Sequence, residues 1–226
     1  MEVTYYGHSC FLVKTGKHQL LFDPFITPNE LAKEVDVNSI KPDYVLLSHG
    51  HQDHMADAEQ ILKQSGATLV GQFELTAWFG NKGVEKTHPM NTGGKWDFDF
   101  GSVRLTPAVH SSSFPDGSYA GTASGFVVEA GGNTFYYAGD TDLFGDMKLI
   151  GERFKPQFAF LPIGDNFTMD AEAALVAARY VGVTKVIGMH YDTFPYIKID
   201  KAAVQARARE EGIELLLPAV GETITL

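Results

Sequence analysis

Residues 43–54, DYVLLSHGHQDH, contain the most specific pattern in the chain. The first part, DYVLLS, is a continuous apolar run of the length expected for a strand that is buried on both faces. His49, His51, Asp53 and His54 then follow within six residues. In an extended segment residues i and i+2 point the same way, so the imidazoles of His49 and His51 can reach one ion. Asp53 and His54 come after a turn towards a helix and could bind a second ion beside the first.

Three more candidate ligands lie where other apolar strands end. His110 follows SVRLTPAV, Asp140 follows NTFYYAG and His190 follows TKVIGM. Strand ends gather at one edge of a sandwich, and catalytic residues are frequent on loops that a rigid scaffold positions. Imidazole nitrogens and carboxylate oxygens suit zinc, and also manganese or iron. The sequence therefore predicts a site for two divalent metal ions at this edge.

The order of elements predicts two sheets. Short β-rich pieces open the chain, and a second β-rich series between residues 95 and 140 resembles a restart of the first. Segments of helical composition at 55–66, 170–182 and 200–212 alternate with apolar strand-like runs. Two such halves favour two packed sheets with helices on the outer faces, a four-layer αββα sandwich of the α/β (α+β) class. No segment resembles a linker, so we expect residues 1–226 to form a single domain.

Composition narrows the classes of function. Lys and Arg total 18 against 28 Asp and Glu, a formal net charge of -10, which disfavours nucleic acid and anionic membranes as partners. The lone Cys10 cannot form an internal disulfide, and the first residues lack the features of a signal peptide. We therefore expect a cytoplasmic protein that acts on a small molecule without binding a membrane. A homo-oligomer is compatible with the sequence.

The ligand pattern resembles that of the metallo-β-lactamase superfamily. More narrowly, GHSCF at 7–11, AGDTDLF at 138–144 and MHYDTFP at 189–195 are similar to prokaryotic metal-dependent hydrolases related to L-ascorbate 6-phosphate lactonase. The resemblance implies a dinuclear centre. The first metal would be held by His49, His51 and His110, the second by Asp53, His54 and His190, with Asp140 bridging the two.

The resemblance also implies a reaction. A metal-activated hydroxide would attack a carbonyl or phosphoryl centre of a small ester, lactone or phosphate-bearing metabolite. Asp53 is the candidate catalytic residue that would orient this nucleophile. His8, in GHSCF, is the second candidate, as a proton shuttle or a donor to a ligand, and a purely structural role is left open.

Two other functions stay open from the sequence. One is a phosphodiesterase or ribonuclease similar to tRNA-processing members, which the acidic composition and the lack of a basic arm disfavour. The other is a metal-bound sensor without turnover. Redox members of the superfamily have an acidic residue where this chain has His51, so oxygen chemistry is not expected. His18 and His88 lack such partners in the sequence, and we expect both to be structural.

Overall fold

The computed structural model describes residues 1–226 and contains two seven-stranded sheets. The first sheet has the order β14-β1-β2-β3-β4-β5-β6. Its strands are β1 (Glu2–Gly7), β2 (Cys10–Thr15), β3 (His18–Phe22), β4 (Tyr44–Leu47), β5 (Thr68–Gln72), β6 (Thr87–Met90) and β14 (Thr223–Thr225). Strands β1 to β3 form an antiparallel meander, and β3 to β6 are parallel.

The second sheet repeats this plan. Its order is β13-β12-β11-β10-β9-β8-β7. Its strands are β7 (Lys95–Phe98), β8 (Gly101–Pro107), β9 (Ser124–Ala130), β10 (Asn133–Tyr137), β11 (Phe158–Pro162), β12 (Lys185–Met189) and β13 (Glu214–Leu216). Strands β7 to β10 are antiparallel and β10 to β13 are parallel. The parallel connections require crossovers, which place helices on the outer faces.

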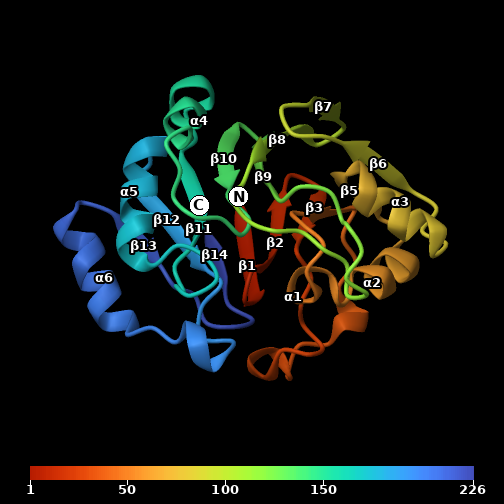
Figure 1. Cartoon of the computed structure of the whole chain (residues 1–226), viewed down its shortest axis with the longest axis horizontal. Coiled ribbons are helices and arrows are strands. Elements are labelled where there is room, and N and C mark those ends of the chain that lie inside the picture. Colours follow the sequence, from red (N-terminus) through yellow and green to blue (C-terminus); the bar gives the residue numbers. More distant parts are fainter.

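Helices cover both outer faces (Figure 1). They are α1 (Gln52–Met55), α2 (Ala58–Ser65), α3 (Phe73–Asn81), α4 (Met147–Phe154), α5 (Ala171–Val181) and α6 (Lys201–Glu210), with 3-10 turns at Glu30–Ala32, Val37–Ser39 and Pro195–Ile197. The α2 helix ends at a left-handed Gly66, and Asp170 caps α5 by accepting from the backbone N–H of Ala173. None of these helices is both long and apolar enough to span a membrane.

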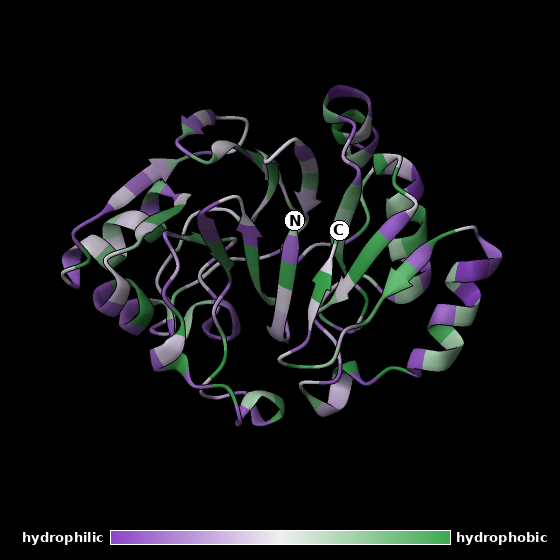
Figure 2. Cartoon of the chain, turned by 180° about the vertical axis from the view of Figure 1, so that it is seen from behind, coloured by the Kyte–Doolittle hydropathy of each residue, from purple (hydrophilic) through white to green (hydrophobic).

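The central strands of the first sheet bury different residues on their two faces. The side chains that join the large core between the sheets are Leu20, Phe22 and Leu46. Those that pack beneath the outer helices are Leu21, Val45 and Leu47. Successive residues of DYVLLS therefore point to opposite faces of the strand. Because both faces are covered, its apolar run is continuous. In Figure 2 hydrophilic residues are frequent on the peripheral helices.

The structure confirms the expected αββα architecture and adds elements that the sequence pattern did not single out. Residues 68–90 contain β5, α3 and β6, and α4 covers Met147–Phe154. Both β5 and β6 are short parallel strands, with Gly71 in one and Pro89 in the other, so neither shows a period of two. The C-terminal strand β14 returns to the first sheet and pairs with β1, which brings the two termini together.

Phe22 provides a test of the core between the sheets. Its ring is fully buried, and its centroid lies 4.7 Å from that of Tyr137. The centroids of Phe135, Phe126 and Phe160 lie 6.0, 6.1 and 6.5 Å away. Replacement by Ala removes these contacts and leaves a cavity, so Phe22→Ala should lower the free energy of unfolding by about 3–5 kcal/mol. Denaturant titration followed by circular dichroism measures this loss.

The matched control is Phe73→Ala, which removes the same atoms from an exposed ring at the start of α3. It should change the free energy of unfolding by less than about 1 kcal/mol. Equal losses in the two variants would show that the inter-sheet cluster does not carry the stability assigned to it.

Candidate metal centre

The candidate ligands lie just beyond the ends of four strands. His49 follows β4 in the first sheet, and His110, Asp140 and His190 follow β8, β10 and β12 in the second. A backbone hydrogen bond from the N–H of Ser124 to the carbonyl of Ser48, 3.0 Å long, ties the two sheets together next to His49. The fold therefore brings residues that are far apart in the sequence to one edge.

The first cluster contains three histidines. A ring nitrogen from each of His49, His51 and His110 lies within 4.8 Å of the others. His49 Nε2 is 2.9 Å from His51 Nδ1, and the ring centroids of His51 and His110 are 5.1 Å apart. His49 is fully buried, whereas the other two are partly exposed, so this cluster opens towards solvent on one side.

The second cluster contains Asp53, His54 and His190, with His8 in addition. The Oδ2 atom of Asp53 lies 4.0 Å from His54 Nε2 and 3.8 Å from His190 Nε2. Asp53 and His54 both belong to the short helix α1, whose start directly after His51 turns their side chains towards the second sheet. One hexapeptide thus supplies ligands to both clusters.

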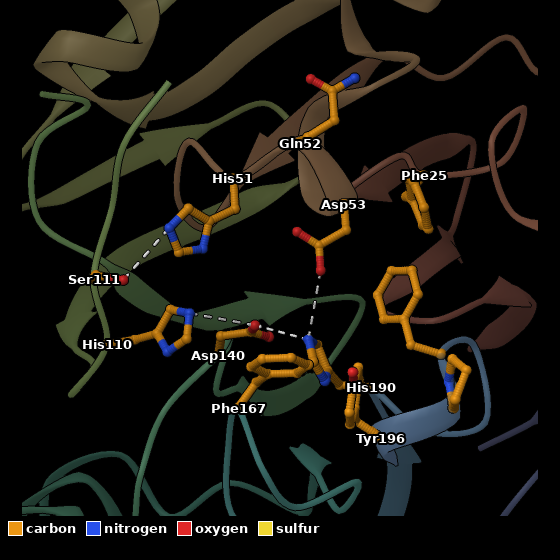
Figure 3. Close-up of a pocket in the computed structure, with 12 residues that line it drawn as sticks. Phe25, His51, Gln52, Asp53, His110, Ser111, Asp140, Phe167, His190 and Tyr196 are labelled. Carbon is orange, nitrogen blue, oxygen red and sulfur yellow. Dashed lines mark hydrogen bonds and ion pairs between the residues drawn. The ribbon is translucent and has the colours of Figure 1, made fainter. Parts of the chain in front are cut away.

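Asp140 lies between the clusters. Its Oδ2 atom is 3.2 Å from His54 Nε2, 2.9 Å from His190 Nε2 and 3.6 Å from His110 Nε2. It also shares a group of possible ligands with His49 and His54. All seven residues predicted from the sequence as ligands are therefore close together, with one buried carboxylate at the centre. Figure 3 shows the five of them that line the pocket, which are His51, Asp53, His110, Asp140 and His190.

Burial and charge act in opposite directions in this site. Burial lowers the pKa of His49, His51 and His110, which keeps these rings neutral and able to bind a metal. Burial opposes the charged form of His54 and His190 too and is the largest single effect, but the neighbouring carboxylates together, led by Asp140, outweigh it. The pKa of His54 is raised well above its usual value and that of His190 to about 9.

The pKa values of Asp140 and Asp53 are also shifted in favour of the charged form. Burial raises the pKa of a carboxyl group, yet the neighbouring His190 and His54 hold the pKa of Asp140 well below its usual range. For Asp53 the opposing groups are His54, His190 and His8, and its pKa is also lowered. The site therefore stabilises two ionised carboxylates and favours positive charge between them.

The donor atoms fit divalent metal ions. Asp140 Oδ1 and His54 Nε2 are buried without a hydrogen-bond partner. A buried polar atom without a partner is costly, and an ion held between these atoms would satisfy both. Imidazole nitrogens with carboxylate oxygens are typical zinc ligands and are also compatible with manganese and iron. The residues present thus fit the group that the sequence implies.

Asp23 contacts His54 of the second cluster and was not singled out by the sequence. It is fully buried, and its Oδ2 atom lies 2.9 Å from His54 Nδ1. The same oxygen accepts hydrogen bonds from Ser48 Oγ at 2.6 Å and Tyr137 Oη at 2.8 Å. A carboxylate on Nδ1 fixes the orientation of the ring and leaves Nε2 free to bind a metal. The only sequence signal was its position at the end of β3.

His8 contacts the site through Asp53. Its Nε2 atom is 3.1 Å from Asp53 Oδ2, and its Nδ1 atom is 3.0 Å from Thr193 Oγ1. Burial lowers the pKa of His8 to about 3, so the ring is neutral. An ionised carboxylate only accepts hydrogen bonds, so Nε2–H donates to Asp53 and Nδ1 accepts from Thr193. The backbone of His8 has φ +56°, which an aspartate, asparagine or histidine tolerates better than most residues.

The remaining histidines lie elsewhere. His18 lies 3.9 Å from Asp43 and 3.8 Å from Asp99, and His88 packs on Trp96 with ring centroids 4.9 Å apart. Neither belongs to a group that could hold a metal. Both fit the structural role expected from the sequence.

A cavity of about 710 Å³ opens over the two clusters. Its floor is formed by candidate ligands, and its walls are largely aromatic (Figure 3). The wall residues outside the ligand set are Phe25, Gln52, Ser111, Phe167, Phe194, Pro195 and Tyr196. A cavity of this size suits a small molecule. Of the loop at 111–122, only Ser111 lines the cavity.

The αββα fold and the buried His and Asp clusters define a metal-dependent hydrolase domain of the metallo-β-lactamase type. A family model described as a beta-lactamase superfamily domain matches residues 18–191. The chain is 49% identical over 227 residues to a UPF0173 metal-dependent hydrolase of Christiangramia forsetii, with 100% of both chains covered. It is 45% identical over 231 residues to the UPF0173 metal-dependent hydrolase YtkL of Bacillus subtilis, again with 100% of both covered.

Solved structures agree with this assignment. The metallo hydrolase Igni18 of Ignicoccus hospitalis superposes with a TM-score of 0.89 at 36% identity, covering 99% of this chain and 97% of that one. An isothiocyanate hydrolase from Delia radicum gut bacteria, at 20% identity and a TM-score of 0.80, shares the fold. The chain belongs to the β-lactamase superfamily and, within it, to the UPF0173 metal-dependent hydrolases, which confirms the resemblance to the superfamily seen in the sequence.

Asp23 provides a test of ligand orientation. In Asp23→Asn an amide replaces the carboxylate that faces His54 Nδ1, so the ring loses its acceptor or its orientation. We expect the affinity for zinc to fall roughly 10- to 100-fold, which is the usual effect of losing such a partner. Competition with a chromophoric chelator measures the affinity, and circular dichroism checks the fold.

The matched control is Asp57→Asn. Asp57 is also buried, but its carboxylate accepts from the backbone N–H groups of Ile26 and Thr27 and contacts no candidate ligand. Its zinc affinity should stay within about 2-fold of the parent protein, because no ligand loses a partner. A zinc affinity unchanged in Asp23→Asn would remove the assigned role of Asp23.

Proposed function

We propose that this chain hydrolyses a small ester, lactone or phosphate-bearing metabolite at a dinuclear metal centre. The observation that carries the proposal is the position of Asp140 Oδ2 within 3.6 Å of imidazole nitrogens from both clusters. A carboxylate placed in this way can be shared by two ions. The first ion would be held by His49, His51 and His110, the second by Asp53, His54 and His190, with Asp140 common to both.

Two divalent ions, when bound, supply a nucleophilic hydroxide near neutral pH and polarise the bond under attack. The residues of the protein orient the reacting groups and hold protons around these two ions. Asp53 reaches the cavity from α1, and its side chain is partly exposed, so it can both bind an ion and orient the nucleophile. His8 holds Asp53 in place through the 3.1 Å contact and does not itself line the cavity. We therefore assign His8 as a positioning residue rather than a catalytic one.

Asp140→Ala tests the shared carboxylate. Without it, the imidazoles of His54 and His190 lose the anion that holds positive charge between the clusters. We expect the protein to retain at most one of two zinc ions. Its kcat/KM should fall by about 100-fold or more, since the loss of even an outer partner of a ligand costs up to about that factor. Metal analysis by mass spectrometry and a screen of esters, lactones and phosphodiesters measure the two effects.

Asp97→Ala is the control, because Asp97 is an exposed carboxylate on β7 that pairs only with Lys95. It should leave metal content and turnover unchanged. Full metal content and full hydrolysis in Asp140→Ala would refute the dinuclear assignment. A loaded parent protein that hydrolyses none of these substrates would favour a metal-bound sensor instead.

His8→Asn tests the positioning role. Asn tolerates the left-handed backbone at this position, so the loop should keep its conformation. We expect two metal ions to remain bound and KM to stay within about 2-fold, while kcat falls roughly 10- to 100-fold because Asp53 is no longer held. Steady-state kinetics separate kcat from KM. Thr193→Val, which keeps the contact between His8 and Asp53, should lower kcat less, and an equal fall in both variants would count against the assignment.

A further inference from the structure

The mouth of the cavity has an aromatic wall, which we define as Phe25, Phe167, Phe194 and Tyr196. Figure 3 shows Phe25, Phe167 and Tyr196 around the side of the site where His190 and Asp53 lie, with His51 and Ser111 on the other side. Phe167 is 50% exposed and Tyr196 is 74% exposed. Large aromatic side chains that border a cavity and stay open to solvent provide apolar surface for a ligand.

The four rings form two pairs, and one of these pairs contacts the ring of His8. Phe167 and Tyr196 meet edge to face, with centroids 6.3 Å apart and planes at 80°. Phe25 and Phe194 lie 6.2 Å apart, and each is 5.4 Å from the ring of His8. The wall therefore extends from the solvent at Tyr196 down to the residue that holds Asp53.

Backbone hydrogen bonds hold the loops that bear the two exposed rings, Phe167 and Tyr196. The loop that bears Phe167 is closed by the N–H of Asp165 donating to the carbonyl of Met169, at 3.0 Å. The N–H of Met169 donates to the carbonyl of Thr141, 3.1 Å away and next to Asp140. Tyr196 lies in the 3-10 turn Pro195–Ile197, and the N–H of Asp192 donates to the carbonyl of Ile197 at 2.7 Å. The wall is thus built into loops that are anchored beside the ligands.

The cavity has no Lys or Arg side chain among its twelve lining residues. Its ionisable members are candidate metal ligands, apart from the phenol of Tyr196. Recognition of a phosphate or carboxylate arm normally uses Arg, Lys or backbone N–H groups at a helix N-terminus. An anionic arm outside the metal centre would have no such side chain to bind, and the chain as a whole has a net charge of -10.

We infer that this pocket selects an uncharged carboxylic ester or lactone that carries a planar aromatic group, and that the aromatic wall binds this group. The inference rests on the proposed hydrolytic function and narrows its substrate class, since it disfavours phosphate-bearing metabolites. In the reaction, water supplies the oxygen of the new bond to the acyl carbon and a proton to the leaving oxygen, whose bond to that carbon breaks. An ester gives a carboxylic acid and an alcohol, and a lactone gives a single hydroxycarboxylic acid.

The inference can be tested by comparing the rates at which the protein hydrolyses esters with and without an aromatic ring. Zinc-loaded and manganese-loaded protein would be compared on ethyl phenylacetate, on ethyl acetate and on phenyl phosphate, with acid release followed by pH-stat titration and phosphate release by colorimetry. We expect kcat/KM for ethyl phenylacetate to exceed that for ethyl acetate by at least about 10-fold, because aromatic contacts add to the burial of the ring. Phenyl phosphate should be the poorest of the three.

Two variants test whether the aromatic wall causes the preference for the aromatic ester. In Phe167→Ser and Tyr196→Ser the ratio of kcat/KM for ethyl phenylacetate to kcat/KM for ethyl acetate should fall at least about 3-fold. Tyr119→Ser is the control, since Tyr119 is 67% exposed and does not line the cavity. It should leave the ratio unchanged.

A binding measurement separates this inference from the proposed function. Calorimetric titration of the loaded protein with phenylacetamide and with acetamide reports the contribution of the ring without any turnover. Tighter binding of phenylacetamide, reduced in both wall variants, supports the inference even if no ester is hydrolysed, an outcome that would refute only the proposed hydrolysis. Equal binding of the two amides, unchanged ratios in the wall variants, or a preference for phenyl phosphate would overturn the inference.

Discussion

The buried carboxylate of Asp140 is the group on which the rest of the site depends. It lies at the end of β10 in the second sheet, within 3.6 Å of imidazoles from both sheets. An ionised carboxylate removed from water costs several kcal/mol unless positive charge compensates it. His54 provides part of this compensation from the first sheet, so the two sheets must be packed together before the charge is satisfied. The complete set of contacts to Asp140 therefore exists only when the two sheets are packed together.

Tyr137 connects that centre to the hydrophobic core. Its ring stacks on Phe22 between the sheets, with centroids 4.7 Å apart. Its hydroxyl donates to Asp23, and Asp23 in turn contacts His54 Nδ1. The aromatic packing that stabilises the fold is thus linked to the orientation of a candidate metal ligand. A change in the core can disturb the site without any direct contact with a ligand.

Much of the fold and of the ligand set followed from the sequence because both depend on local patterns. The apolar run before His49 indicated a buried strand, and the three later ligands were each found just beyond such a strand. Asp23 also follows a strand, β3, but the sequence does not show which partner it has, and it likewise does not show the partner of Thr193. Each is a common turn residue in the sequence, and its partner is more than 30 residues away along the chain. Only the packed sheets bring these pairs together.

The aromatic wall could not be predicted from the sequence for a related reason. Its members lie on three separate loops, at 25, 167 and 194–196, and an isolated Phe or Tyr is found in a core far more often than at a pocket. The structure separates the two cases because these rings border the cavity above the ligands. The superfamily to which the chain belongs hosts many reactions, so the fold and the candidate ligands do not by themselves determine the substrate. Selection among substrates must then come from the parts of the cavity that are not ligands. In this chain those parts are mainly apolar rings, with no Lys or Arg among them, so shape and aromatic contact are the physical basis of selectivity.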